Sequence, residues 1–218
     1  MITAVTPRLN LIFDGAHDGL FNMALDESLF RDHIQKKGAD SILRFYRFSE
    51  PTLTVGYGMW RAVNLSPGGQ NQAIRRLTGG GIVSHTREDL TYSLIVPISA
   101  HSALGKVKDS YYFIHDLLRG TFQSLNLDAE LYQKCDADCE YEKISYCFDS
   151  PVLHDIMLAG KKIAGAGQKR SQGHLLQQGS IAWQEVLRLS PDLDEHEFCE
   201  RFANATASAF NLSVTEVE

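Results

Sequence analysis

Two arginines followed by three glycines form the segment of this sequence best suited to holding a ligand. Residues 75–85 read Arg-Arg-Leu-Thr-Gly-Gly-Gly-Ile-Val-Ser-His. The glycines carry no Cβ atom, so their backbone N–H groups can approach a bound group closely. The arginines supply positive charge suited to a carboxylate or a phosphate. A tight turn is the alternative, but three consecutive glycines favour a ligand loop. The pattern is neither a Walker A loop nor a dinucleotide-binding fingerprint.

A second candidate segment places a lysine beside small residues. Residues 160–168 read Gly-Lys-Lys-Ile-Ala-Gly-Ala-Gly-Gln. The small side chains leave open space along a predicted strand, in which Lys162 and Ile163 point in opposite directions. A lysine in such a site could hold an acyl oxygen or a phosphate. Lys161 is instead expected at the tip of a basic hairpin.

A cysteine could supply a nucleophile. Cys147 lies within Ser-Tyr-Cys-Phe-Asp-Ser-Pro at residues 145–151, and a thiolate stabilised by a nearby cation is a good acyl-transfer nucleophile. On its own, a free cysteine is more often an inert small hydrophobe. Cys135 and Cys139 could form a metal or disulfide pair, but no second pair completes a zinc set. We therefore expect free thiols and no metal site.

The elements that must position these residues are strands in the middle of the chain and helices near its start, middle and end. Helical spacing of apolar residues predicts helices at residues 19–37, 109–125 and 193–210. Strands are predicted at residues 10–14, 42–48, 52–57, 73–77, 82–85, 90–97, 129–132, 154–158, 162–168 and 174–183. This order predicts an α+β fold with a central mixed or antiparallel sheet flanked by helices, in one domain over residues 1–218.

Some finer expectations follow from the same patterns. Asp18 is expected to cap the first helix and Gly38 to end it. The buried stripe of that helix is expected at Phe21, Leu25 and Leu29. Residues 133–151 read as a long acidic loop, a kind of segment that tends to be functional or mobile. Several other histidines are expected to be exposed or to cap helices: His33, His101, His115 and His196.

The composition is that of an ordinary globular protein. The 218 residues are 44% hydrophobic, and 21 basic against 27 acidic residues give a formal net charge of −6. The apolar content argues against disorder, and the acidic balance argues against a nucleic-acid partner. No apolar run is long enough to cross a membrane. Residues 1–10 lack the pattern of a signal peptide, so we expect a cytoplasmic protein with reduced thiols.

Taken in order, the candidate segments resemble the signature of the lipoate-protein ligase A and octanoyltransferase family. In that signature the arginines and glycines of residues 75–85 are followed by Asp-Leu-Thr-Tyr-Ser, here residues 89–93. Further matches are Asn-Met-Ala-Leu-Asp-Glu at 22–27, Leu-Arg-Phe-Tyr-Arg at 43–47, Pro51-Thr52 with Gly56, and Gly-Lys-Lys-Ile-Ala-Gly at 160–165. The resemblance covers most of the chain.

The resemblance implies a fold like that of biotin- and lipoate-protein ligases, with a central sheet flanked by helices. In this family the arginine–glycine loop wraps the acyl group and its activated carbonyl. The lysine before Ile-Ala-Gly lies against the reacting carbonyl or an adenylate phosphate, and this role falls on Lys162. The substrate-binding positions that the resemblance implies are Arg76, Thr78, Gly79, Gly80, Gly81, His85, Gly165, Ala166 and Gln168.

Two chemistries occur in this family. Ligases use ATP and Mg²⁺ to activate lipoate and pass it to a lysine of a lipoyl domain. Octanoyltransferases and related amidotransferases instead form a cysteine thioester, with acyl carrier protein or a glycine-cleavage H-type protein as the donor. Cys147, followed by Phe148 and Pro151, resembles the transferase pattern. We therefore expect Cys147 as the nucleophile, Lys162 stabilising its thiolate and the developing oxyanion, and no ATP.

One departure from the family pattern falls in the strand after the lysine. Many members have His-Gly where this chain has Gln178 and Gly179. Glutamine can donate a hydrogen bond, but it cannot carry a proton as histidine can. A protein that binds an acyl group or cofactor without catalysis therefore stays as an alternative beside the transferase and the ligase.

Overall fold

The computed structural model describes residues 6–37, 39–60, 73–133 and 151–217. Several expectations fall outside these residues and stay predictions. They concern Gly38, Cys135, Cys139, Cys147 and nearly all of the loop expected at residues 133–151.

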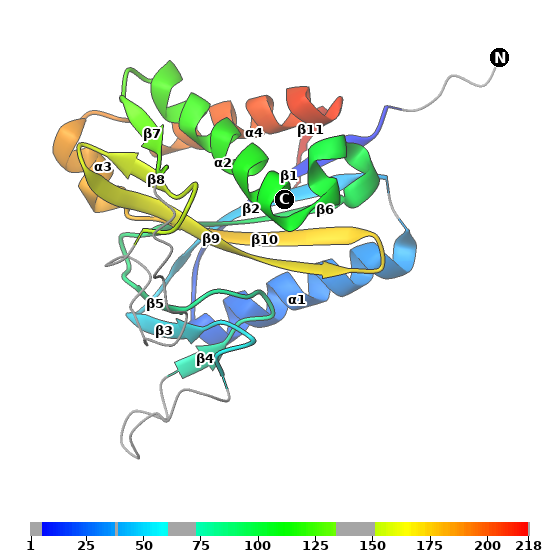
Figure 1. Ribbon diagram of the computed structural model, residues 1–218. Helices are drawn as coiled ribbons and strands as arrows, with labels where there is room; N and C mark the ends of the chain where they lie inside the picture. Colours follow the sequence, from blue (N-terminus) through cyan, green and yellow to red (C-terminus); the bar gives the residue numbers. More distant parts are fainter. Residues whose placement is uncertain (1–5, 38, 61–72, 134–150, 218) are drawn as a thin grey trace.

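An eight-stranded mixed sheet forms the centre of the molecule, in the order β11-β1-β2-β6-β10-β9-β8-β7 (Figure 1). Strand β1 runs parallel to both β2 and β11, and the other neighbours are antiparallel. The strands are β1 (Arg8–His17), β2 (Ser41–Phe48), β6 (Leu90–Pro97), β7 (Ala129–Leu131), β8 (Ile156–Leu158), β9 (Lys161–Ser171), β10 (His174–Ile181) and β11 (Ser213–Glu216).

A second sheet of three strands carries the arginine–glycine segment, in the order β4-β3-β5. These strands are β3 (Thr52–Val55), β4 (Ala73–Arg75) and β5 (Ile82–His85). Strand β3 pairs parallel with β4 and antiparallel with β5, so the segment between β4 and β5 crosses the end of β3. This small sheet lies on the same side of the main sheet as α1 (Gly19–Lys36) (Figure 1).

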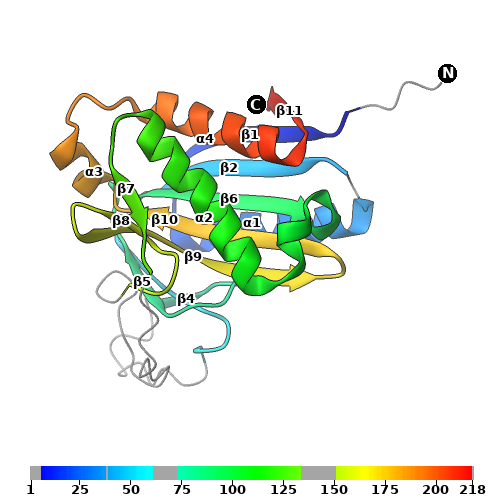
Figure 2. The same ribbon diagram turned by 45° about the horizontal axis from the view of Figure 1, so that its top comes forward.

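The helices cover the two faces of the main sheet unequally. Helices α2 (Val107–Ser124) and α4 (Glu195–Phe210) lie together over one face, and α1 lies over the other (Figures 1 and 2). Short helix α3 (Trp183–Leu189) follows β10, and 3₁₀ turns η1 (Ile98–Ala100) and η2 (Ser102–Gly105) lead into α2. Among the described residues, no helix has both the length and the apolar character needed to cross a membrane.

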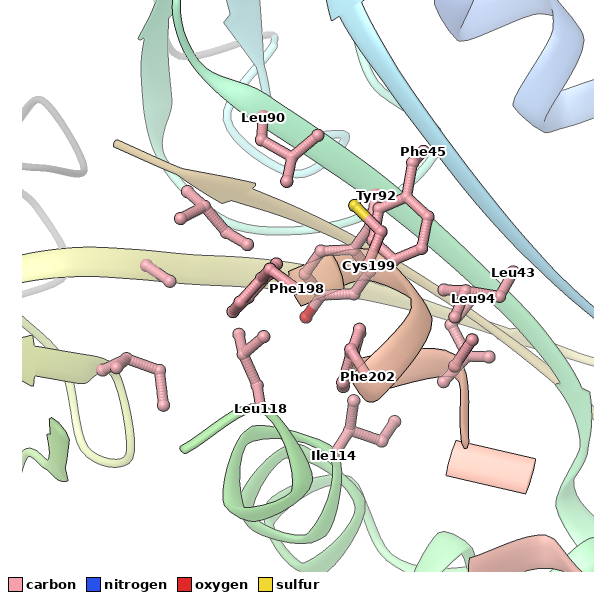
Figure 3. Packing of buried hydrophobic residues seen from close by; sticks show 14 of the residues in the cluster. Leu43, Phe45, Leu90, Tyr92, Leu94, Ile114, Leu118, Phe198, Cys199 and Phe202 are labelled. Atoms are coloured by element: carbon pink, nitrogen blue, oxygen red, sulfur yellow. The ribbon is translucent and has the colours of Figure 1, made fainter. Parts of the chain in front are cut away.

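The main hydrophobic core lies between the sheet and the α2–α4 pair. Phe198 and Phe202 of α4 point at the sheet, where Tyr92 of β6 is fully buried, and Ile114 and Leu118 of α2 close the cluster (Figure 3). At about 25 cal/mol for each Å² of apolar surface removed from water, aromatic and branched side chains in such a core are the main source of stability. This core fixes the sheet on which the candidate site is built.

Helix α1 differs from the expectation on its buried face. Asp18 caps it as predicted, because its side chain accepts a hydrogen bond from the backbone N–H of Phe21 at 2.9 Å. The expected apolar stripe is wrong: the side chain of Phe21 is 46% exposed, and Leu25 and Leu29 are only partly buried. The buried residues are Gly19, Asn22, Met23, Asp26, Phe30 and His33. The buried polar residues lack the apolar signal that a helical-spacing argument looks for.

Several other expectations also need correction. His33 and His115 are buried rather than exposed, whereas His101 does cap η2, accepting from the N–H of Ala103 at 3.1 Å. Trp183 begins α3 and is not the end of a strand. Elements α3 and β11 lie where the sequence predicted none. The expected fold class, α+β with a mixed sheet flanked by helices, is confirmed.

Candidate active site

The arginine–glycine loop, residues 76–81, is held against strand β9 by its backbone. The N–H of Gly79 donates to the carbonyl oxygen of Gln168 at 3.1 Å. Gly167 allows this approach, because a Cβ atom there would collide with the carbonyl oxygen of Gly79. Gly56 permits a similar approach from β3, since its Cβ would overlap the carbonyl of Gly80, which itself has φ +97°. The loop therefore needs glycine on both sides of the contact, not only within its own run.

Arg76 stabilises the loop from inside. Its Nη2 donates to the carbonyl oxygens of Gly81 at 2.9 Å and Gly79 at 3.3 Å, and its Nη1 donates to Oγ1 of Thr54 at 2.6 Å. The side chain is buried. The structure thus places the Arg76 guanidinium on loop carbonyl groups, where it fixes the direction in which the loop N–H groups point.

His85 lies beneath the same loop. Its Nε2 is 2.8 Å from Oγ1 of Thr54, and its ring stacks on Phe48 with centroids 4.2 Å apart. Burial, with a smaller effect of the nearby Arg76 charge, lowers the pKa of His85 to about 3. The imidazole is therefore neutral near pH 7, where it supports the loop without adding charge.

Lys162 forms the second half of the candidate site. Its Nζ is 2.7 Å from Oδ2 of Asp155, and both side chains are at least 95% buried, with 5% and 1% exposed. Lys161 occupies the hairpin tip as predicted: Ala159 and Gly160, with φ of 48° and 77°, form the turn, and the Lys161 side chain is 67% exposed. The two adjacent lysines thus have different environments: Lys162 faces a buried carboxylate, and Lys161 faces solvent.

Tyr111 of α2 completes the surroundings of Asp155. Its hydroxyl donates to Oδ1 of Asp155 at 2.6 Å and accepts from the N–H of Ala166 at 3.1 Å. Strand β8 ends its pairing with β9 at Ala164. The Tyr111 hydroxyl therefore serves as the acceptor for the Ala166 N–H, which has no partner on β8. Burial and the Asp155 charge raise the pKa of Tyr111 well above 10, which keeps the hydroxyl protonated.

Both halves of the site lie on one side of β9. A Cβ atom at Gly165 would point at Lys162 and Asp155, and a Cβ atom at Gly167 would point at Gly79. Residues two apart on a strand share a face. The Lys162–Asp155 pair lies over Gly165 and the glycine loop lies over Gly167, so the two groups are adjacent on the same face of β9.

The side chains of the remaining predicted residues point elsewhere. Gln168 accepts from Oγ of Ser110 on α2 at 3.0 Å and donates to Gln177 at 2.7 Å, on the opposite face of β9. Ala166 shares that face by strand alternation. Only the backbone carbonyl of Gln168 reaches the loop. Cys147 lies outside the described residues, but Val152, five residues later, donates its N–H to Asp155 at 2.7 Å.

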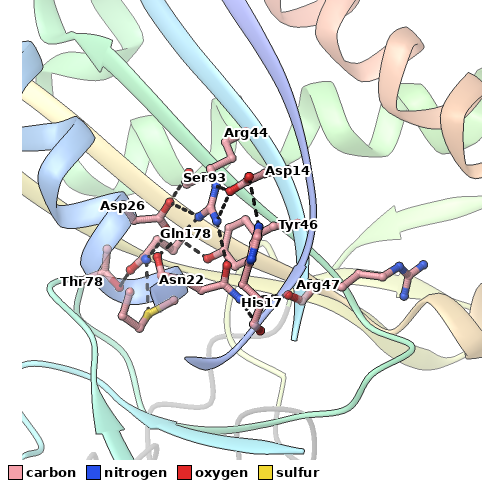
Figure 4. Close-up of polar contacts among 11 residues, drawn as sticks. Asp14, His17, Asn22, Asp26, Arg44, Tyr46, Arg47, Thr78, Ser93 and Gln178 are labelled. Atoms are coloured by element: carbon pink, nitrogen blue, oxygen red, sulfur yellow. Dashed lines mark hydrogen bonds and ion pairs between the residues drawn. The ribbon is translucent and has the colours of Figure 1, made fainter. Parts of the chain in front are cut away.

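A buried polar network beneath the site was not predicted from the sequence. Arg44 of β2 forms ion pairs with Asp26 at 2.8 Å and with Asp14 at 2.6 Å (Figure 4). It also donates to Asn22 at 2.7 Å, one turn before Asp26 on α1. The signal was present in the sequence: two polar residues lie four apart in a predicted helix, and Arg44 lies between the apolar Leu43 and Phe45 in a predicted strand.

The network reaches the glycine loop through Thr78. The hydroxyl of Thr78 donates to Oε1 of Gln178 at 2.8 Å, and Nε2 of Gln178 donates to Oδ2 of Asp26 at 2.6 Å (Figure 4). All these side chains are buried. Gln178, noted above only as a departure from a family pattern, thus lies between helix α1 and the loop.

This fold, with a glycine loop and a buried lysine on one side of β9, defines a catalytic domain of the lipoate-protein-ligase type. The family model described as the lipoyl protein ligase A/B catalytic domain matches residues 18–205. The chain therefore belongs to this family, as the resemblance of its motifs predicted.

Among curated proteins, the chain is similar to enzymes named octanoyltransferase LipM. It is 39% identical to the one from Bacillus cereus over 183 residues, which cover 80% of this chain and 63% of that protein. For the one from Bacillus subtilis, it is 34% identical over 190 residues, which cover 84% and 65%. The chain thus spans less than two thirds of the length of these relatives.

Solved structures support the fold. A lipoate-protein ligase A bound with ATP superposes with a TM-score of 0.73 at 20% identity, covering 98% of this chain and 89% of that one. A putative lipoate protein ligase from T. acidophilum with bound lipoic acid gives a TM-score of 0.71 at 22% identity, covering 98% and 89%. These TM-scores show a shared architecture, which places the chain in the same fold as the ligases.

Proposed function

We propose that this protein is an octanoyltransferase of protein lipoylation, which moves an octanoyl group through a thioester on Cys147 to a lysine of a lipoyl domain. The observation that carries the proposal is the match to octanoyltransferases named LipM at 39% identity over 183 residues. The arrangement on β9 supports it, because a buried lysine and a backbone loop facing each other suit the carbonyl of an acyl group.

The proposed reaction has two acyl transfers. The Cys147 thiolate attacks the carbonyl carbon of an octanoyl thioester and forms a new C–S bond. The C–S bond to the donor breaks, and the donor leaves as a thiolate that takes a proton from solvent. The amine of the acceptor lysine then attacks the enzyme thioester. An amide bond forms, the C–S bond breaks, the amine loses its proton to solvent or a base, and the Cys147 thiolate is regenerated. Because the donor is already activated, neither step needs ATP.

Lys162 is proposed to supply the positive charge for both steps. An ammonium near a thiol favours the thiolate, and near a developing oxyanion it stabilises the transition state. The ion pair with Asp155 at 2.7 Å holds the ammonium in one place inside the protein. Backbone N–H groups of the glycine loop, which lies over Gly167, are proposed to hold the acyl carbonyl region. Lys162, which lies over Gly165, would then contact the same region from the opposite direction.

The donor and acceptor are proteins in this proposal. We infer an octanoyl acyl carrier protein or an octanoylated glycine-cleavage H-type protein as donor, and a lipoyl domain as acceptor. One structural relative is described as a bi-partite lipoate protein ligase and its E2 lipoyl domain from Thermoplasma acidophilum, with a TM-score of 0.61. That description concerns the relative, and it supports a lipoyl domain as the kind of acceptor to test here.

The second candidate is an ATP-dependent lipoate ligase, because the structural neighbours include a ligase bound with ATP. Intact-mass analysis distinguishes the two. Mixed with octanoyl acyl carrier protein without ATP, a transferase gains the octanoyl mass on its own chain. A ligase instead forms a lipoyl adenylate, and only with lipoate, ATP and Mg²⁺. Tight lipoate binding with neither product supports a binding protein.

The same assay tests the nucleophile. Cys147→Ser should abolish the thioester adduct and octanoyl transfer, since serine is a far weaker nucleophile at neutral pH. Cys135→Ser is the matched control, and it should transfer like the wild type. A Cys147→Ser variant that still transfers octanoate at the wild-type rate contradicts the cysteine mechanism.

A further inference from the structure

The glycine loop is fixed to the main sheet at two points that lie next to each other in the sequence. One is the backbone bond from the N–H of Gly79 to Gln168 on β9, at 3.1 Å. The other is the side-chain bond from the hydroxyl of Thr78 to Gln178 on β10, at 2.8 Å. Thr78 is fully buried and Gln178 is 7% exposed, so water does not compete for this second bond.

The other end of the Gln178 amide meets a carboxylate whose position is fixed. Asp26 accepts from Nε2 of Gln178 at 2.6 Å, from Arg44 at 2.8 Å, from the Tyr46 hydroxyl at 2.9 Å and from Oγ of Ser93 at 2.8 Å. Two donors meet each carboxylate oxygen, so the hydrogen-bonding capacity of Asp26 is used by β2, β6 and β10 together (Figure 4).

The chemistry of these groups fixes the direction of each hydrogen bond. The Asp26 carboxylate, paired with Arg44, can only accept, so Gln178 must turn its NH₂ group toward Asp26. Its carbonyl oxygen then faces Thr78 and can only accept, so the Thr78 hydroxyl must donate. A glutamine satisfies both neighbours at once, whereas an apolar residue satisfies neither.

We infer that Gln178 is a positioning residue: it transfers the fixed orientation of Asp26 to Thr78 and so sets the place of the glycine loop over Gly167 of β9. The part of this inference that concerns acyl transfer rests on the proposed function. The part that concerns the loop does not, because the contacts of Thr78 and Gly79 exist without a substrate.

Amide hydrogen exchange tests the loop directly. In Gln178→Leu, the Thr78 hydroxyl loses its acceptor, and we expect the Gly79 amide to exchange at least ten-fold faster while the amides of α2 and α4 keep their rates. Gln184→Leu is the matched control, since Gln184 is exposed on α3, and it should leave the Gly79 rate unchanged. An unchanged Gly79 rate in folded Gln178→Leu overturns the inference.

Gln178→Glu provides a second test that does not depend on the leucine variant folding. When protonated, the new carboxyl group can donate to Asp26 and accept from Thr78, as the amide does. When ionised, it places a second negative charge beside Asp26. The other charged or titratable groups of this network are Arg44, Tyr46, Asp14, which pairs with Arg44, and His17, which contacts Asp14. Lowering the pH from 8 to 6 should therefore restore protection of Gly79 in Gln178→Glu, after correction for intrinsic exchange. The wild type and Gln184→Glu should show no such recovery.

Kinetics tests the consequence for acyl transfer. A loop displaced by a fraction of an ångström is expected to lower kcat of octanoyl transfer by about ten- to hundred-fold with a smaller change in KM. Thr78→Val should have the same effect, and the double variant with Gln178→Leu should be no worse than either single variant. Additive losses contradict action through Thr78. If the wild type does not transfer octanoate, the proposed function fails, while hydrogen exchange still decides the role of Gln178.

Discussion

Lys161 and Lys162 are neighbours in the sequence with opposite environments. Lys161 pairs with Glu185 at the surface, at 3.1 Å, whereas Lys162 is buried against Asp155. We expect Lys162→Ala to lower the rate of octanoyl transfer by about 10²–10³, the loss typical of one oxyanion donor. Lys162→Arg should restore only part of the rate, because the guanidinium fork differs in shape from a compact ammonium.

Initial rates and thiol alkylation against pH measure this prediction. Removing the ammonium should raise the pKa of the Cys147 thiol, so the alkylation profile of Lys162→Ala should move to higher pH. Lys161→Ala is the matched control and should behave like the wild type. Equal effects at the two lysines, or an alkylation profile that does not move, remove Lys162 from the mechanism.

Asp155 is expected to matter for stability as well as for rate. Asp155→Asn takes the countercharge away from buried Lys162, and breaking a buried ion pair typically costs about 3–5 kcal/mol. The free energy of unfolding in urea should fall by that order. Tyr111→Phe leaves the Ala166 N–H without its acceptor and should cost less, about 1–3 kcal/mol. An Asp155→Asn variant as stable as the wild type would show that the ion pair contributes nothing net.

Only some of the individual residues of the candidate site could be predicted from the sequence. The glycine loop was found because three consecutive glycines are unusual, and Lys162 because it precedes a run of small residues. Asp155 and Tyr111 were not, because their importance comes from a contact between residues 44 positions apart. Gln178 was noticed as a departure, but its partners Thr78 and Asp26 lie 100 and 152 residues away.

At the scale of elements, the pairing of loop and strand depends on glycine at Gly167. An alanine there would put its Cβ against the carbonyl oxygen of Gly79, which is backbone and cannot easily move. We expect Gly167→Ala to lower the free energy of unfolding by about 1–3 kcal/mol, the usual cost of overpacking, and to lower octanoyl transfer. Urea unfolding and initial rates provide the measurements.

The matched control for this substitution is Gly120→Ala on α2. No atom lies within 4 Å of a Cβ built at Gly120, and alanine favours a helix over glycine by about 1 kcal/mol. This variant should therefore be as stable as the wild type or more stable. If Gly167→Ala matches Gly120→Ala in stability and rate, the close approach of loop and strand is not required.

Element positions were more predictable than element faces. Strand β6 was predicted from its β-prone residues, and helix α2 from the helical spacing of its apolar residues. The prediction of the buried face of α1 was wrong, because Asn22 and Asp26 are buried through their hydrogen bonds to Arg44 and not through hydrophobicity. Short elements such as α3 carry too few residues for a period to appear.

At the scale of the whole molecule, long-range pairing determines what local patterns cannot. Strand β11, four residues near the end of the chain, adds in parallel beside β1 at the edge of the main sheet. Arg44 joins Asp14 of β1 to Asp26 of α1, so one buried arginine links three elements of the N-terminal half. The pairing of β11 with β1 has no local sequence signature, which is why the sheet order could not be predicted.

Buried histidines make the stability of the whole molecule depend on pH. Burial lowers the pKa of His115 to about 4. The Asp155 charge and the hydrogen bond to the His154 carbonyl act in the opposite direction, and the charges of Lys162 and His154 lower it. In the unfolded chain the pKa returns to 6.5. Below pH 6.5 His115 binds a proton in the unfolded state, whereas in the folded state it stays neutral down to about pH 4. The stabilisation from neutral His115 is therefore complete above pH 6.5 and is lost as the pH falls, by about 1.4 kcal/mol for each pH unit.

His115→Asn isolates this contribution, because the asparagine amide can still donate to the carbonyl of His154, as Nδ1 of His115 does at 2.7 Å, but cannot titrate. Between pH 6.5 and pH 5, the free energy of unfolding of the wild type should fall by about 2 kcal/mol more than that of His115→Asn. His196→Asn is the control, since the His196 side chain is 58% exposed, and its slope should match the wild type. Urea unfolding at the two pH values measures each slope. Parallel slopes for wild type and His115→Asn would mean that the folded protein accommodates the charged imidazole.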